Sequence, residues 1–208
     1  MPVTRRVVPP IGLAGLLCVW GACAAPEPGS SASATPVPPV IERALAQGGK
    51  VTMRLSAGQY TIENSPGDAI RLAWETRDPG DASRVRARVD VDGASAMVHA
   101  EGPSNGFTVT IGVPTRSDLW IRLSAGDLTI RGVEGHKDVS AWAGELKIGV
   151  GAASQYRVVD TAVLAGEIQA APFQGSKGGV FRSFQWTGTG PYELRARLTA
   201  GEITLRDK

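Results

Sequence analysis

Apolar and polar residues alternate one by one through most of the chain after residue 40, in short runs separated by glycine. No stretch keeps a helical period. One-by-one alternation places successive side chains on opposite faces of a β-strand, and glycine between such runs marks the turns. The pattern predicts an all-β protein, with strands at 69–75, 84–91, 107–113 and 177–186 besides the repeats described next.

One phrase occurs five times: alanine, glycine, a polar residue, an apolar residue, any residue and an apolar residue. Its glycines are 68, 18, 22 and 35 residues apart, at Gly58, Gly126, Gly144, Gly166 and Gly201. The two short steps are in the range of one solenoid coil, and stacked coils bury a continuous core. Each glycine should mark a corner where a positive φ or a close backbone approach excludes a β-carbon.

These patterns predict a single right-handed, single-stranded β-solenoid-like domain over residues 40–208. A segment rich in proline, alanine and serine precedes it at 24–39, and its composition predicts a disordered linker. Residues 1–23 have the order of an export signal: two arginines, an apolar run and then small residues. The apolar run is shorter than the ~20 residues of a membrane-spanning helix.

Cys23 is the candidate lipid anchor, because Gly21-Ala22-Cys23 is similar to the end of a bacterial lipobox. The alternative is cleavage near Ala24 or Ala25, which would release a soluble periplasmic protein. We therefore expect either an outer-membrane lipoprotein, facing the periplasm or the surface, or a soluble periplasmic protein.

Composition excludes several function classes. No cysteine follows Cys23, so neither a disulfide framework nor a thiolate metal site is available. The chain has 22 Lys+Arg and 20 Asp+Glu; without the two signal-peptide arginines the count is 20 of each, which gives no electrostatic footprint for nucleic acid. His99 and His136 have no partner at ligand spacing, so we expect no zinc and no other cofactor.

The stretch LSAGDLTIRGVEGHKDVSAWAGELKIG, with Val113-Pro114 and Leu119-Trp120-Ile121 before it, resembles the DUF4097 group of adhesin-like bacterial proteins. VTMRLSAGQYTIENSPGDAIRLAW and GTGPYELRARLTAGEITLRD are similar to it as well, so the likeness covers roughly residues 51–208. The resemblance implies a β-helical fold, also described as a toastrack, and a place in the cell envelope. Trp142 and the segment 177–186 depart from the family pattern.

Acidic residues follow four of the corner glycines, with Gln59 at the equivalent place in the first repeat; they are Asp127, Glu145, Glu167 and Glu202. Stacked coils lie ~4.8 Å apart, and like charges directly opposite are destabilising. We interpret this acid row as a solvated face that splays into water or pairs with arginines; a bound cation such as Ca²⁺ is the alternative. Paired carboxylates could also serve a carbohydrate-active β-helix enzyme with Trp120, Trp142 and Trp186 as platforms, although acids in every repeat favour a surface ladder.

Two residues before each corner glycine, most repeats carry a hydroxyl side chain, but Trp142 and Leu164 are large and apolar. If the repeats stack in chain order, this pair forms an outward apolar patch, a common signature of an interaction site. Coverage by another strand, such as 180–186, is the alternative. We expect Trp142 to be partly accessible.

The leading hypothesis is a non-enzymatic binding or scaffolding module of the cell envelope, whose partner is another envelope protein or a surface glycan. It would reach the membrane through a lipid anchor if Cys23 is modified. The alternatives are the carbohydrate-active enzyme and a sensor component of the envelope.

Overall fold

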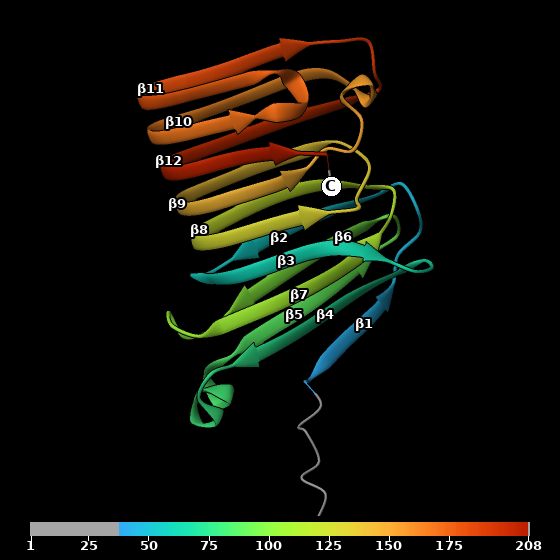
Figure 1. Cartoon of the computed structure of the whole chain (residues 1–208). Helices are drawn as coiled ribbons and strands as arrows, with labels where there is room; N and C mark the ends of the chain where they lie inside the picture. The colour runs from blue at the N-terminus through green and yellow to red at the C-terminus, as the bar shows by residue number, and fades with distance from the viewer. Residues whose placement is uncertain (1–37, 208) are drawn as a thin grey trace, which may run out of the picture. The chain divides into compact units, whose positions relative to one another are not determined.

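The computed structural model of the chain describes residues 38–207. These residues form twelve strands and three short 3-10 helices (Figure 1). In chain order they are β1 (Val40–Ala44), β2 (Gly49–Leu55), β3 (Gly58–Ser65), β4 (Ala69–Thr76), η1 (Pro79–Arg84), β5 (Arg86–Asp92), β6 (Ser95–Glu101), β7 (Phe107–Pro114), β8 (Ser117–Arg131), β9 (Lys137–Gly149), η2 (Ala153–Gln155), β10 (Tyr156–Ala170), η3 (Ala171–Phe173), β11 (Gly175–Thr187) and β12 (Tyr192–Arg206). The all-β prediction is confirmed, and the four strands predicted outside the repeats correspond to β4, β5, β7 and β11.

The twelve strands form one open sheet. Its main path runs β1-β4-β7-β3-β8-β9-β12-β10-β11, and β2 and β6 continue from β8 along a second path that ends at β5. The pairs from β3 through β8, β9 and β12 to β10 are parallel, whereas β1, β5 and β11 pair antiparallel at the ends of the paths.

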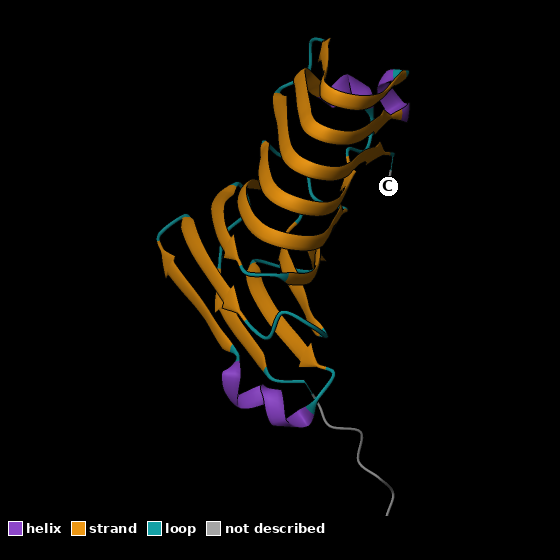
Figure 2. Ribbon diagram, turned by 90° about the vertical axis from the view of Figure 1, so that its left-hand side faces the viewer, coloured by secondary structure: helices purple, strands orange, loops and turns teal. Residues whose placement is uncertain are grey.

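The long strands β8, β9, β10 and β12 each curve around a corner (Figure 2). In β8, Leu123 and Leu128 are both buried. Strict alternation would place residues five positions apart on opposite faces, so the buried face changes phase at the glycine between them. Each long strand therefore has a first arm before its corner glycine and a second arm after it, and the buried sides of both arms join one core cluster. β2 and β3 hold the same two places as separate strands, since β2 pairs with the first arm of β8 and β3 with the second.

The corner glycines stack side by side and form a column across the sheet. Gly126, Gly144, Gly201 and Gly166 have φ angles of 109°, 128°, 131° and 143°. A β-carbon on any of them would overlap the carbonyl oxygen of a neighbouring glycine in the column. Both conditions that exclude a β-carbon are therefore met at these four corners, as the sequence predicted.

The order of the long strands differs from their order in the chain. β12 lies between β9 and β10 and pairs parallel and in register with both, so that Gly201 lies opposite Gly144 on one side and Gly166 on the other. The expectation that repeats stack in chain order is therefore wrong for the last three. Because β9, β10 and β12 carry the same Ala-Gly-Glu corner and each has an inward apolar pair after it, each can pair in register with either of the others, and the local pattern does not select the neighbour.

Candidate functional site at the corner surface

The outward position two residues before each corner glycine forms a row along the outer side of the column. From β2 to β10 this row contains Ser56, Ser124, Trp142, Thr199 and Leu164. Trp142 is 69% exposed and Leu164 is 43% exposed. Thr199 of β12 stands between them in the row, so they are not on neighbouring strands, as chain order would have placed them.

Strand β11 extends the row with two apolar residues that sequence reasoning did not single out. It pairs antiparallel with β10 and brings Val180 opposite Ala165, and this register places Phe181 beside Leu164. Val180 is exposed, and Phe181 is 81% exposed. The segment 180–186 therefore does not cover Trp142 and Leu164, as the alternative had it. Instead, Val180 and Phe181 add to the exposed apolar surface. We call Trp142, Leu164, Val180 and Phe181 the apolar corner.

Phe181 has a φ angle of 52°, one of two positive values among the described residues other than glycine. A bulky residue in this region is a genuine outlier. The signal in the sequence is the consecutive apolar pair Val180-Phe181, which breaks one-by-one alternation at the point where β11 turns. The turn points both side chains outward instead of one inward.

A hollow of about 400 Å³ lies beside the apolar corner. Leu164, Phe181 and Thr199 line it on the corner side, and Arg182 and Arg197 also reach it. Arg182 donates to the carbonyl of Gly178, while Arg197 is paired with Asp160 at 2.5 Å. The hollow thus combines an apolar wall with two arginines that internal bonds hold in place.

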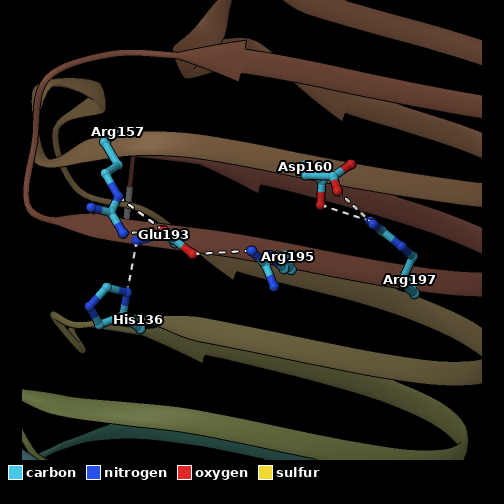
Figure 3. Close-up of polar contacts among 6 residues, drawn as sticks. All are labelled: His136, Arg157, Asp160, Glu193, Arg195 and Arg197. Carbon is cyan, nitrogen blue, oxygen red and sulfur yellow. Dashed lines mark hydrogen bonds and ion pairs between the residues drawn. The ribbon is translucent and has the colours of Figure 1, made fainter.

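An ion-pair network covers the outer face of the first arms further from the corner (Figure 3). Glu193 of β12 accepts hydrogen bonds from Arg157 of β10 and from Arg195 on its own strand. The bond from Arg157 lowers the pKa of the Glu193 carboxyl. The backbone N–H of Glu193 donates to Nδ1 of His136 at 3.1 Å, so this imidazole nitrogen serves as a structural acceptor that links β12 to the start of β9.

The acid row lies on the outer face of the second arms. Glu145, Glu202 and Glu167 follow one another across β9, β12 and β10, with Asp127 of β8 beyond Glu145. Three of the acids bond to the side chain two residues later in their own strand: Glu145 to Lys147 at 2.6 Å, Glu202 to Thr204 at 2.9 Å, and Glu167 to Gln169 at 3.2 Å.

This arrangement is that of a repeated surface ladder. Neighbouring acids stand in equivalent positions of equivalent strands, so no pair is set apart as an acid and a nucleophile. The tryptophans proposed as sugar platforms lie elsewhere: Trp120 and Trp142 are on first arms, and Trp186 packs against Phe173 with ring centroids 4.8 Å apart. Within residues 38–207, no group of three or more His, Cys, Asp or Glu side chains is placed to hold a metal ion.

Sequence reasoning also missed a buried amine. Lys137 at the start of β9 is 1% exposed, and its Nζ donates to the hydroxyl of Tyr156 at 2.7 Å. Burial lowers the pKa of Lys137 to about 8, although the nearby carboxylates Glu134 and Asp118 oppose this. Burial also raises the pKa of Tyr156. Period-two counting could have found Lys137, since it stands in phase with the inward residues Val139 and Ala141.

The export signal, the Cys23 anchor and most of the 24–39 linker lie outside the described residues. Within the described part of the chain, no helix is long and apolar enough to cross a membrane.

No protein-family model matches the chain, and no curated protein matches it. Among solved structures, a provisionally named cell adhesion protein from Clostridium sporogenes is 12% identical, with a TM-score of 0.49 over 83% of this chain and 100% of that one. A provisionally named adhesin from Bacteroides fragilis is 9% identical, with a TM-score of 0.25 over 83% and 98% of the two chains. A provisionally named lipid-binding protein from Parabacteroides distasonis is 8% identical, with a TM-score of 0.23 over 81% and 96%. Membership of the DUF4097 group stays a prediction from the residues.

Proposed function

We propose that the chain is a non-enzymatic binding module of the bacterial cell envelope and that it recognises its partner through the apolar corner. The observation that carries the proposal is the clustering of exposed apolar side chains. Six large apolar residues are exposed among residues 38–207, and four of them form the apolar corner. Exposed apolar groups gathered in one place mark interaction sites more often than scattered ones do.

The backbone of Phe181 supports the same proposal. A left-handed conformation costs a residue with a β-carbon about 1–2 kcal/mol, and such strain concentrates at functional sites. Here the strain keeps a phenyl ring in water, where it contributes little to folding. Tryptophan and phenylalanine are also enriched in protein interfaces, which suits an adhesin-like role toward an envelope protein or a surface glycan.

The proposal includes an architecture and a cellular address. In it, the stacked arms of β8, β9, β12 and β10 are turns of a right-handed β-solenoid of the DUF4097 type. Crossover connections between parallel strands of one sheet are right-handed in about 98% of cases, which supports the handedness. The export signal would deliver the domain to the envelope, where Cys23 would anchor it by lipid or cleavage would release it, and the 24–39 linker would hold it away from the membrane.

The test is co-sedimentation with envelope fragments from cells that lack this protein. We expect Trp142→Ser and Phe181→Ser each to weaken binding at least tenfold, because truncation of buried aromatic contacts typically costs about 2 kcal/mol or more. Met97→Ser is the matched control, since Met97 is 48% exposed on β6, outside the apolar corner. Binding that is equal in all four proteins would contradict the proposal.

Treatment of the fragments separates the two classes of partner. Protease digestion should abolish binding if the partner is a protein, and periodate oxidation should abolish it if the partner is a glycan. Turnover of surface glycans by the wild-type chain, lost in Glu145→Gln, would instead favour the carbohydrate-active enzyme.

A further inference from the structure

The pentapeptide Arg-Leu-Ser-Ala-Gly occurs twice, at 54–58 and 122–126. The first copy runs from the end of β2 to the start of β3, and the second lies in β8, with which both strands pair parallel and in register. As a result, Arg54 and Arg122 stand directly opposite each other on the outer face. Like charges in this position repel each other and destabilise a sheet.

A hollow of about 320 Å³ lies at this place. Arg54 and Arg122 line it together with the hydroxyl residues Ser56 and Ser124, and β6 contributes His99 and Glu101. Two guanidinium groups, two hydroxyls and an imidazole give the hollow an excess of hydrogen-bond donors over acceptors. We call it the arginine pocket.

Among residues 38–207, internal side-chain bonds engage the polar groups of the arginine pocket except those of Arg54 and Ser124. The Ser56 hydroxyl accepts from the N–H of Gly102 at 3.2 Å and lies 3.5 Å from the hydroxyl of Tyr60. Arg122 is paired with Asp138 at 2.7 Å, and His99 with Glu101 at 2.8 Å. Arg54 makes no ion pair and no side-chain hydrogen bond with any residue of 38–207.

A third copy of the pattern provides a contrast within the same protein. Arg197-Leu198-Thr199-Ala200-Gly201 occupies the equivalent place on β12. Ser140 of β9, rather than a second arginine, stands opposite Arg197 on one side, and on the other side Arg197 pairs with Asp160 of β10. The third arginine is thus paired with a carboxylate, whereas the nearby carboxylate of Glu101 is paired with His99 and not with Arg54.

We propose that the arginine pocket binds an oxyanion, in the form of a phosphate, sulfate or carboxylate group. The planar fork of arginine matches the oxygen atoms of such groups and makes two parallel hydrogen bonds to them. The anion is held between Arg54 and Arg122, where it reduces their repulsion, and the hydroxyl of Ser124 donates to one of its remaining oxygens. Glu101 limits affinity because its carboxylate borders the same space.

This inference does not rest on the proposed function, since none of the apolar corner residues lines the arginine pocket. Phe181→Ser should leave anion binding unchanged, and Arg54→Gln should leave the exposure of the apolar corner unchanged. The failure of one proposal is therefore visible without the failure of the other.

The experiment is an NMR titration of the ¹⁵N-labelled full chain with sodium phosphate, sodium sulfate and sodium acetate in turn, at constant ionic strength. Saturating shifts at residues 54–56 and 122–124 are expected with at least one of the three salts. Saturation by phosphate and sulfate identifies a tetrahedral ligand group, and saturation by acetate alone identifies a carboxylate.

Arg54→Gln should weaken the binding at least tenfold, while Arg54→Lys, which keeps the charge but loses the fork, should have a smaller effect. Arg43→Gln, which removes the same charge from exposed β1, should change affinity less than twofold. Glu101→Gln should tighten binding severalfold. Shifts that stay linear with all three salts, or equal affinity in wild type and Arg54→Gln, would overturn the proposal; unfolding midpoints of the variants verify that each is folded.

Discussion

The amine of Lys137 donates a 2.7 Å hydrogen bond to the hydroxyl of Tyr156 inside the core, where Lys137 lies between Leu119 of β8 and Leu194 of β12. Strands β9 and β10, which follow one another in the chain but are separated in the sheet by β12, are thus joined at one polar point in an apolar layer. This bond makes the stability of the domain depend on pH in a way that surface groups do not.

The first prediction is that the free energy of unfolding rises between pH 8 and 10. Lys137 has a pKa of about 8 in the folded protein, whereas the ordinary pKa of a lysine amine, which we take for the unfolded chain, is 10.5. In this range the unfolded chain binds more protons than the folded one, so stability increases with pH, by up to about 3 kcal/mol over the full interval. Above pH 10 the raised pKa of Tyr156 acts in the opposite direction, because the unfolded chain then loses a proton that the folded chain keeps.

Urea unfolding at pH 7, 8, 9 and 10 measures this dependence. Lys137→Met should remove most of the rise between pH 8 and 10, whatever its effect on stability at pH 7. A variant that keeps the wild-type slope would show that another group is responsible.

The second prediction concerns the glycine column. A β-carbon at Gly144 would overlap the carbonyl oxygen of Gly126, and its φ angle of 128° disfavours any other residue. Gly144→Ala should therefore lower the free energy of unfolding by about 3 kcal/mol or more. Gly93→Ala is the control, because Gly93 also has a positive φ but no heavy atom lies within 4 Å of the added carbon; it should cost about 1 kcal/mol. If the two substitutions lowered the free energy of unfolding equally, the positive φ alone, and not the close approach of neighbouring corner glycines, would determine the requirement for glycine.

The third prediction tests the position of β12. Neighbouring strands are ~4.8 Å apart, within the Cα range of a disulfide, whereas strands two places apart are not. With Cys18 and Cys23 replaced by serine, Trp142→Cys with Thr199→Cys should form a disulfide on mild oxidation, and Trp142→Cys with Leu164→Cys should not. The reverse result would restore the chain-order stacking of β9 on β10.

The fourth prediction separates strain from function at Phe181. Phe181→Gly should leave the unfolding midpoint unchanged or raise stability by up to about 1 kcal/mol, because glycine adopts a φ of 52° without penalty. The same substitution should weaken envelope binding as strongly as Phe181→Ser does. A large loss of stability would show that the ring is needed for folding and would weaken the case for a functional role.

The sequence predicted the elements well because they depend on local chemistry. Alternation determines which side of a strand is buried, and the requirement for glycine at Gly126 and Gly144 follows from a backbone approach that repeats at every corner. The order of β9, β12 and β10 is different, since it depends on which of several equivalent surfaces pair. Trp142 and Leu164 were predicted to form an adjacent pair, but their separation by Thr199 depends on the position of β12 and could not be predicted from the sequence.

The candidate site was predicted less completely than the fold. The consecutive apolar pair Val180-Phe181 signals the turn of β11, but the position of Phe181 beside Leu164 depends on the pairing of β11 with β10, which no local pattern predicts. The facing pair Arg54 and Arg122 lies 68 residues apart in sequence and becomes visible only when β2 is placed beside β8. The repeated Arg-Leu-Ser-Ala-Gly would have suggested it, had identical repeats been assumed to pair in register.

The most direct test of the central claim is ¹⁹F NMR of the chain labelled with 5-fluorotryptophan, with and without envelope fragments. Substitution of each tryptophan by phenylalanine assigns its resonance, and Trp74, on β4 and packed against the core, is the internal reference. We predict that the Trp142 resonance shifts or broadens when the fragments bind, while that of Trp74 does not. A Trp142 resonance that stays unchanged under conditions where the chain co-sediments with the fragments would contradict recognition through the apolar corner.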